Sequence, residues 1–232
     1  MACNISLAGD LLVAAGLVNK ISCGTINLEV FGVPWATKKA IENGLLSFCE
    51  HDHSSILARL SATRLGLPFV PLPDVGKNDW SAALLSGLPE EFALVENRTL
   101  GHRNVIVALP LRPDICILHV PAADPQGNLY SAGPQCFDEE LVLASKSVLA
   151  TCEVVAPAEQ CLNEYGRPLI QSLFIDEVVE VKGGAYPSCV PGFYSVAGPA
   201  IQQYNIAVHK GVKFEDCLSL LMRKTRVLGS GG

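Results

Sequence analysis

The chain has 232 residues, which is enough for one α/β domain with a substantial core or for two small domains. Its net charge of −6, with no cluster of Lys and Arg, excludes the basic surface typical of nucleic-acid-binding proteins. The longest early apolar run, residues 11–18, is too short to cross a bilayer and follows no charged segment, so neither a membrane span nor a signal peptide is predicted.

The composition also predicts a partner chain and a reducing compartment. Hydrophobic residues make up 49% of the sequence and charged residues 17%, so we expect a large permanent interface. The nine cysteines are scattered without a Cys-x-x-Cys pair, and several lie inside apolar runs. We therefore expect reduced, buried thiols in a cytoplasmic protein rather than disulfides.

The first third of the chain alternates short helices with short strands. Several expected helices stop near a glycine, which readily takes the left-handed conformation that ends a helix. The expected elements are, in order, a helix over residues 11–17, one or two strands within 21–31, a helix over 37–43, a helix capped by Ser54 or Ser55, and an extended connection over 67–74.

Two apolar runs in the middle of the chain, residues 105–109 and 115–120, do not alternate polar with apolar residues. Such runs are typical of strands buried on both faces in a central parallel sheet. The second run leads into a turn that contains Pro and Gly. Since ligands of open α/β sheets bind beyond the carboxyl ends of the strands, Asp124, Gly127 and Asn128 are candidate substrate-facing residues. The alternative is an ordinary turn whose Asp and Asn bond the local backbone.

The remaining segments complete an alternating pattern. Residues 76–103 have a mixed composition and are expected to form an excursion from the main sheet. Beyond the turn, a helix is expected to begin with Asp138 as its N-cap. Strands over 148–155 and 174–181 and a helix over 199–208 follow. Together these elements predict an α/β fold with a mostly parallel sheet flanked by helices.

Three stretches of the chain resemble one known family when they are taken together. They are Gly9-Asp-Leu-Leu-Val-Ala-Ala-Gly-Leu-Val18, Leu111-Arg-Pro-Asp114 running on to Ala123-Asp-Pro-Gln-Gly-Asn128, and Phe174-Ile-Asp-Glu-Val-Val-Glu-Val-Lys-Gly-Gly-Ala-Tyr-Pro187. With Gly66-Leu-Pro-Phe-Val-Pro71 between the first two, they resemble the α (A) subunit of family I coenzyme A transferases of the glutaconate type. The resemblance covers nearly the whole chain in the family's order.

The resemblance implies the fold and the assembly of that family. A single α-type domain would span residues 1–232, with the mostly parallel sheet of the NagB/RpiA-like fold, and would join a β subunit in an αβ or α2β2 complex. CoA, acyl-CoA and carboxylic acids would be substrates, with no permanently bound cofactor. The family's first βαβ unit, with its Gly-Gly-Phe signature, has no counterpart before Gly9, so we expect a truncated start or a shortened member.

The implied reaction moves CoA between two carboxylic acids through a glutamate, which forms a mixed anhydride and then a glutamyl-CoA thioester. In heteromeric members this glutamate lies on the β subunit, in a Ser-Glu-Asn-Gly setting. Here Glu42-Asn43-Gly44 matches the triplet, but Ile41 replaces the serine. We therefore do not expect Glu42 to be the nucleophile, and no residue of this chain is a certain catalytic group.

The A subunit of the ring-opening CoA hydrolase is also similar. It carries its own glutamate in the turn that follows the helix expected here over residues 37–43. The matching position here is His53, so a hydrolase would require Glu50 or His53 to take that role. Ser54 is either substrate-facing or a helix cap. A metal site at His51 and His53 is not expected, because no third ligand accompanies them.

Three functions therefore stay open. The resemblance favours an α-type subunit of a CoA-transferase whose nucleophile lies on a partner chain. An acyl-CoA hydrolase or ring-cleaving subunit is the second hypothesis, and a non-catalytic subunit that serves only for interaction is the third. The identity of the acid depends on the shape of a pocket to which both chains would contribute.

Overall fold

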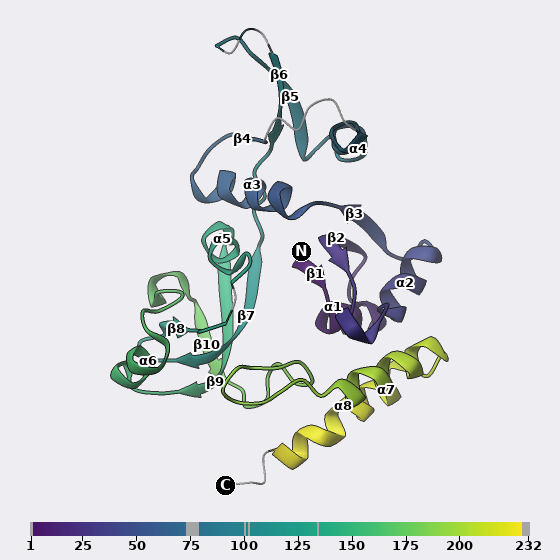
Figure 1. Cartoon of the computed structure of the whole chain (residues 1–232), viewed down its shortest axis with the longest axis vertical. Helices are drawn as coiled ribbons and strands as arrows, with labels where there is room; N and C mark the ends of the chain where they lie inside the picture. The colour runs from purple at the N-terminus through teal and green to yellow at the C-terminus, as the bar shows by residue number, and fades with distance from the viewer. Residues whose placement is uncertain (1, 73–78, 100, 102, 134, 229–232) are drawn as a thin grey trace.

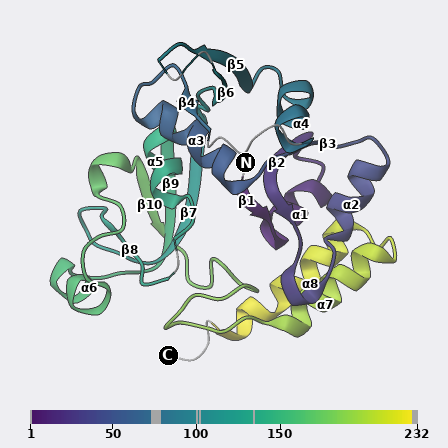
Figure 2. The same cartoon turned by 45° about the horizontal axis from the view of Figure 1, so that its top comes forward.

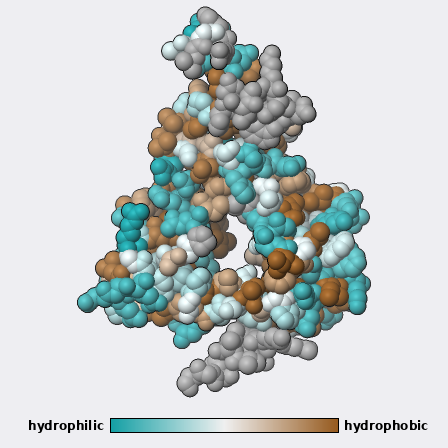
Figure 3. Space-filling model, in the orientation of Figure 1, coloured by the Kyte–Doolittle hydropathy of each residue, from teal (hydrophilic) through white to brown (hydrophobic). Residues whose placement is uncertain are grey.

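The computed structural model describes residues 2–72, 79–99, 101, 103–133 and 135–228, and it contains three small sheets (Figure 1). Two of them are largely parallel and lie on opposite sides of the molecule, and the antiparallel third sheet lies at one end. The view turned by 45° shows the same arrangement (Figure 2). A space-filling view shows an opening through the molecule between the two parallel sheets (Figure 3).

The first sheet has three parallel strands in the order β1-β2-β3. A helix follows β1 and another follows β2, as parallel pairing requires, because a chain that returns in the same direction needs a crossover. Two late helices pack beside them, α7 against α2 and α8 against α7. The elements are β1 (Ala2–Ile5), α1 (Leu7–Ala14), β2 (Lys20–Ile26), η1 (Glu29–Phe31), α2 (Trp35–Glu42), β3 (Ser47–Glu50), α7 (Gly198–His209) and α8 (Phe214–Leu228).

The second sheet has four strands in the order β10-β9-β7-β8. The strands β7, β9 and β10 are parallel, and β8 returns antiparallel to β7 after a tight turn. One face of the sheet carries an apolar core that includes Cys116, Val120, Val148 and Ala150. The elements are β7 (Ile115–Ala123), β8 (Leu129–Tyr130), α5 (Asp138–Ala144), β9 (Ser147–Val155), α6 (Ala158–Tyr165), η2 (Ser172–Phe174) and β10 (Glu177–Glu180).

The third sheet is antiparallel, with the order β4-β6-β5, and α3 leads into it from the first sheet. The prediction that residues 105–109 belong to the central parallel sheet is therefore wrong. The chain between β5 and β6 is only residues 98–102, which is too short for the crossover that parallel pairing needs. The elements are α3 (His53–Arg64), β4 (Val70–Pro71), α4 (Asp79–Gly87), β5 (Phe92–Asn97) and β6 (Arg103–Ala108).

Two element boundaries differ from those expected because tertiary contacts fix them. The helix expected over residues 11–17 begins at Leu7, which places Asp10 in its first turn, where its carboxylate accepts a hydrogen bond from the amide of Thr37 at 2.7 Å. The strand expected over 174–181 is shorter, since the 3-10 turn η2 precedes it and only β10 pairs with β9.

The expected N-caps of two helices are also corrected. The cap of α3 is Asp52 rather than Ser54 or Ser55, because its carboxylate accepts a hydrogen bond from the amide of Ser55 at 2.9 Å. The N-cap residue of α5 is not Asp138, which is already the first residue of the helix. The carboxylate of Asp138 instead accepts a hydrogen bond at 3.2 Å from the amide of Cys136, which lies before the start of the helix.

Five cysteines, Cys23, Cys116, Cys152, Cys161 and Cys217, are buried as free thiols. The expectation of buried thiols is confirmed for these five. Burial raises the pKa of the Cys116 thiol to about 11, so this group is an unreactive core residue. Within the described part of the chain, no helix combines the length and the apolar character that crossing a membrane requires.

Candidate functional site

A cavity of about 750 Å³ opens beside the carboxyl ends of β2 and β3. Its wall comes from residues 24–25 of β2, residues 48–53 at the junction of β3 with α3, and Ala83, Leu84, Gly87 and Leu88 from α4 and the residue after it. The carboxyl ends of parallel strands are where open α/β sheets bind ligands, since the loops there diverge to leave a crevice. The fold itself therefore makes this cavity a candidate site.

The junction between β3 and α3 is fixed by backbone and cap hydrogen bonds. The amide of His51 donates to the carbonyl of Cys23 at 3.1 Å, which continues the pairing of β2 with β3 past the end of β3. The carboxylate of Asp52 then accepts from the amide of Ser55 and from the hydroxyl of Ser54. These bonds place His53, the first residue of α3, at the cavity wall.

A buried cluster of charged residues supports this junction from behind. Arg59 is 6% exposed, and its guanidinium donates to the carboxylate of Glu91 and, at 3.1 Å, to the carbonyl of Leu109. The Nε2 atom of His51 lies 3.2 Å from the same carboxylate. Burial acts to raise the pKa of Glu91, but His51 and the charge of Arg59 outweigh it and hold that pKa below its ordinary value. Glu91 is thus an anion that fixes α3 to the loop before β5.

The turn after β7 is the second place where predicted site residues lie. Asp124 is 3% exposed, and its carboxylate accepts hydrogen bonds from the amides of Gln126 and Asn128 at 3.0 and 2.9 Å. It also accepts from the side-chain amide of Asn128 at 2.8 Å and the hydroxyl of Tyr130 at 2.9 Å. Burial acts to raise the pKa of Asp124, but these donors outweigh it and lower that pKa. The carboxylate therefore holds the turn together.

Asn128 connects this turn to the segment before β10. Its side-chain oxygen accepts a hydrogen bond from the amide of Ser172 at 2.9 Å, while its nitrogen donates to Asp124. Gly127 has φ +88°, and a Cβ added there would lie 3.5 Å from the Cβ of Ser172. Both the oxygen and the nitrogen of the Asn128 side-chain amide therefore form hydrogen bonds within the protein, and these bonds hold the turn against the segment before β10.

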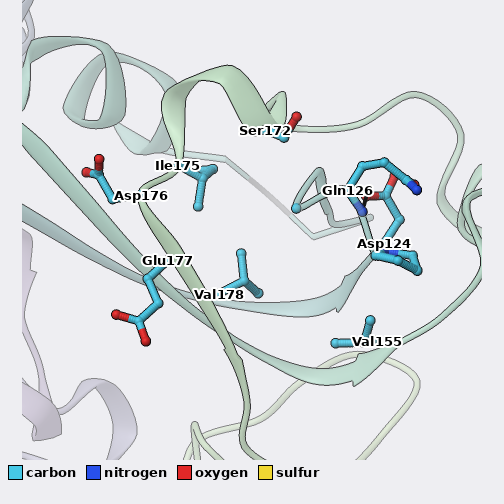
Figure 4. Close-up of a pocket in the computed structure, with 10 residues that line it drawn as sticks. Asp124, Gln126, Val155, Ser172, Ile175, Asp176, Glu177 and Val178 are labelled. Carbon is cyan, nitrogen blue, oxygen red and sulfur yellow. Dashed lines mark hydrogen bonds between the residues drawn. The ribbon is translucent and has the colours of Figure 1, made fainter.

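A smaller cavity of about 320 Å³ lies between this turn and β10. Figure 4 shows the apolar side chains of Ile175 and Val178 between the carboxylate of Glu177 and the turn that carries Asp124. The residues that line this cavity come from the second sheet and its loops, whereas those that line the cavity of 750 Å³ come from the first sheet, from α3 and from α4 and the residue after it. The structure therefore does not bring Asp124, Gly127 and Asn128 together with Glu50 and His53.

Comparison with known proteins identifies relatives of the chain, although no protein-family model matches it. The A subunit of glutaconate CoA-transferase from Acidaminococcus fermentans is 28% identical over 208 residues, which cover 84% of this chain and 65% of that protein. The A subunit of 3-oxoadipate CoA-transferase from Pseudomonas knackmussii is 26% identical over 197 residues, which cover 81% of this chain and 65% of that protein. The chain is a homologue of CoA-transferase A subunits. It spans about two thirds of the length of these relatives.

Solved structures share the fold of this CoA-transferase A-subunit homologue. The crystal structure of glutaconate CoA-transferase from A. fermentans superposes with a TM-score of 0.78 at 23% identity, over 94% of this chain and 71% of that one. A crystal structure of a variant of the decarboxylase AibA/AibB superposes with a TM-score of 0.80 at 28% identity, over 94% of this chain and 79% of that one. The resemblance and the fold class predicted from the sequence are confirmed.

Two of the site residues predicted for this chain line the cavity of 750 Å³. Glu50 and His53 both line it with exposed side chains. The ring of His53 also packs edge-on against Phe137, with the ring centroids 5.9 Å apart. Ser54 is adjacent, but it is not part of the wall, and its hydroxyl donates to Asp52. The cavity therefore pairs a carboxylate with an imidazole.

Glu42 lines neither the cavity of 750 Å³ nor the cavity of 320 Å³. It is the last residue of α2, its side chain is 61% exposed, and its carboxylate lies 3.8 Å from Nζ of Lys38 one turn earlier. An exposed i,i+4 ion pair of this kind is common on helix surfaces. A nucleophile would need a pocket around it to exclude water and hold the thioester, and neither cavity includes Glu42.

The chain contains another polar cluster, around Glu153, that was not predicted from the sequence. Glu153 is 3% exposed on β9, and its carboxylate accepts from the hydroxyl of Tyr194 and the amide of Gly183, both at 2.6 Å. His119 of β7 lies 2.8 Å from it through Nε2. A glutamate inside the apolar run of β9 was the available signal, because buried charges in such runs need partners. The cluster anchors the loop that leads to α7.

The described residues offer no set of side chains that could bind a metal ion. Within those residues, no group of three or more His, Cys, Asp or Glu side chains is arranged to hold an ion. His51 is directed at Glu91, and its side chain is fully buried.

Proposed function

We propose that this chain is the A-type subunit of a heteromeric CoA-transferase, which moves CoA from an acyl-CoA to a second carboxylic acid. The observation that carries the proposal is the homology with two CoA-transferase A subunits over more than four fifths of the chain. The cavity beside β2 and β3 is where the thioester would react, since it lies at the ligand-binding edge of the sheet.

We also propose that the nucleophilic glutamate is supplied by a β-type partner. The only Glu-Asn-Gly triplet in the sequence contains Glu42, whose exposed position gives it no surrounding pocket. In the proposed reaction, a partner carboxylate attacks the acyl-CoA carbonyl and expels the CoA thiolate, which leaves a mixed anhydride. The thiolate then attacks the glutamyl carbonyl and releases the first acid. The second acid attacks the carbonyl of the glutamyl-CoA thioester and expels the CoA thiolate, which leaves a second mixed anhydride. The thiolate then attacks the acyl carbonyl of that anhydride, which forms the new acyl-CoA and frees the glutamate carboxylate.

An exposed apolar sheet face supports the proposal of a partner in an αβ or α2β2 assembly. Alternate residues of β7, β9 and β10, continued by Val181 directly after β10, point to the same face, and five aliphatic side chains there are 38–75% exposed. Soluble monomers rarely leave such a contiguous patch uncovered. The five buried free thiols also favour the cytoplasm, where thiols stay reduced. The five residues are Ile115, Ile117, Leu149, Val179 and Val181.

The test is reconstitution with the β-type subunit encoded beside this gene. The purified complex is expected to exchange CoA between two acids, with double-reciprocal plots that stay parallel as in ping-pong catalysis. The isolated chain is expected to show no exchange. Exchange by the isolated chain would contradict the assignment of the nucleophile, and a silent complex would contradict the transferase function.

A subunit that cleaves the acyl-CoA without an acceptor acid is the second candidate. Two observations favour it, namely that Glu50 and His53 line one cavity and that a structure named as a decarboxylase superposes at 28% identity. A carboxylate and an imidazole at one site are suited to general acid–base chemistry. Release of free CoA, or of carbon dioxide with CoA retained on the product, in the absence of any acceptor acid would establish the second candidate and exclude the first.

A further inference from the structure

The wall of the cavity beside β2 and β3 is largely apolar. Phe48 faces it from β3, and Leu84 and Leu88 face it from the end of α4 and the residue after it. Leu84 is 4% exposed and packs with Phe92 in the core beneath, so this wall is part of the folded core. An apolar wall stabilises a hydrocarbon group because binding removes apolar surface from water on both sides.

The ionised side chains on the wall are acidic. Glu50 and Asp52 line the cavity, and none of the described lining residues is Lys or Arg. Behind the wall, Arg59 and Lys20 are both directed at Glu91: Arg59 donates to its carboxylate, and Nζ of Lys20 lies 4.0 Å from it. A carboxylate bound in the cavity would therefore lose its hydration and face two acidic groups without a counter-ion.

The two histidines of the wall do not replace that counter-ion. The side chain of His51 is fully buried, and its Nε2 atom is 3.2 Å from Glu91. The ring of His53 packs edge-on against Phe137. Neither offers the bidentate contact that an arginine makes with a carboxylate.

We propose that this cavity takes a bulky, uncharged acyl group, so that the CoA substrate is the thioester of an apolar monocarboxylic acid. The inference rests on the proposed function and specifies its substrate class. It separates this chain from the relatives named for glutaconate and 3-oxoadipate, which are both dicarboxylic acids. The volume of about 750 Å³ agrees with it, since sites of about 300–1,000 Å³ hold drug-sized ligands. A five-carbon diacid would leave most of this space to water.

The experiment uses the complex of the chain with its β-type partner. Cyclohexanecarboxylate and glutarate serve as alternative acceptors with acetyl-CoA as the donor, and kcat/KM is measured for each acid. Equilibrium binding of cyclohexanecarboxyl-CoA and glutaryl-CoA to the same complex is measured separately. Both measurements are expected to favour the cyclohexyl compound by at least about tenfold, the difference that about 1.4 kcal/mol produces.

Two variants test whether the cavity wall sets this preference. Leu88→Lys and Thr25→Lys each place a cation on the wall, and each is expected to shift the ratio of the two binding constants toward glutaryl-CoA by at least about tenfold. Thr25 is exposed, so its variant keeps the test valid if Leu88→Lys does not fold. Leu94→Lys is the matched control, because Leu94 is 53% exposed on β5 and lies outside the cavity wall.

The outcomes separate this inference from the proposed function. Preferential binding of cyclohexanecarboxyl-CoA without transfer to either acid would overturn the transferase function and keep the acyl class. Transfer to glutarate with tighter binding of glutaryl-CoA would keep the function and overturn the acyl class. A wild-type preference that neither cavity variant shifts relative to Leu94→Lys would overturn the assignment of the acyl group to this cavity.

Discussion

The hydroxyl of Tyr204 donates a hydrogen bond to the carboxylate of Asp10 at 2.9 Å, across 194 positions of sequence. Both residues are completely buried. The same carboxylate accepts from the amide and from the hydroxyl of Thr37, each at 2.7 Å. One aspartate therefore joins α1, α2 and α7, and the late helix is fixed to the first sheet through it.

Replacing this aspartate should destabilise the fold strongly. Asp10→Ala removes three accepted hydrogen bonds and leaves buried donors of Thr37 and Tyr204 without partners. An unsatisfied buried group costs about 1–3 kcal/mol, so we expect the free energy of unfolding to fall by about 3 kcal/mol or more. Urea denaturation followed by circular dichroism measures this. Tyr204→Phe is the milder comparison, with a loss of about 1 kcal/mol. A loss below about 1 kcal/mol for Asp10→Ala would contradict the role given to the carboxylate.

The buried pair behind the larger cavity gives a second prediction. Glu91→Gln leaves the guanidinium of Arg59 buried without its counter-charge, and breaking such pairs costs about 3–5 kcal/mol. We expect the midpoint of thermal unfolding to drop accordingly. Glu90→Gln is the matched control, because the neighbouring Glu90 is exposed and surface changes cost within about 0.5 kcal/mol. Equal midpoints for the two variants would show that the cluster does not hold α3 in place.

The lowered pKa of Asp124 predicts a pH dependence of stability with a definite sign. The unfolded chain protonates this carboxyl near its ordinary pKa of about 3.9, and the folded chain only at lower pH. The stabilisation is therefore fully present above about pH 5 and is lost as the pH falls through the folded pKa. Asp124→Asn lacks it at every pH. Denaturant unfolding from pH 7 to 3 should show a difference between the two proteins that is largest at neutral pH and shrinks in acid; a constant difference would contradict this.

Glu42→Ala tests the residue that matches the family's catalytic triplet. The side chain lies on an exposed helix end, so we expect the reconstituted complex to keep a rate within about twofold of wild type. The steady-state rate of CoA exchange is the measurement. A fall in kcat of about a thousandfold or more, the scale seen when a covalent nucleophile is removed, would identify Glu42 as the nucleophile.

The local pattern of the sequence predicted the elements that neighbouring residues determine. The run at 115–120, apolar apart from His119, became β7, and the Pro and Gly that follow it form the turn that Asp124 closes. The expectation that this strand is buried on both faces is wrong, because Ile115 and Ile117 are 57% and 75% exposed. Residues 105–109 have the same local pattern but lie in an antiparallel sheet. Their direction depends on the short connection from β5, which an apolar run alone does not reveal.

The polar clusters could not be predicted, because they join residues distant in sequence. Arg59 and Glu91 are 32 positions apart, and their ionic contact exists only because the loop before β5 returns to α3. The sequence placed Glu50 and His53 near each other but gave no account of the apolar wall from α4 that completes their cavity. Neighbouring residues determine whether a segment forms a helix or a strand, whereas contacts between residues distant in sequence determine which side chains form a site.

The most direct test of the account is to locate the covalent intermediate. The complex of this chain with its β-type partner is incubated with an acyl-CoA and treated with borohydride, which reduces a glutamyl thioester to an alcohol, and both chains are mapped by peptide mass spectrometry. We expect the reduced glutamate on the partner chain, with Glu42 and Glu50 of this chain unmodified. Modification of a glutamate of this chain, or exchange that proceeds with no modified glutamate on either chain, would contradict the proposal that this A-type chain works with a nucleophile supplied by its partner.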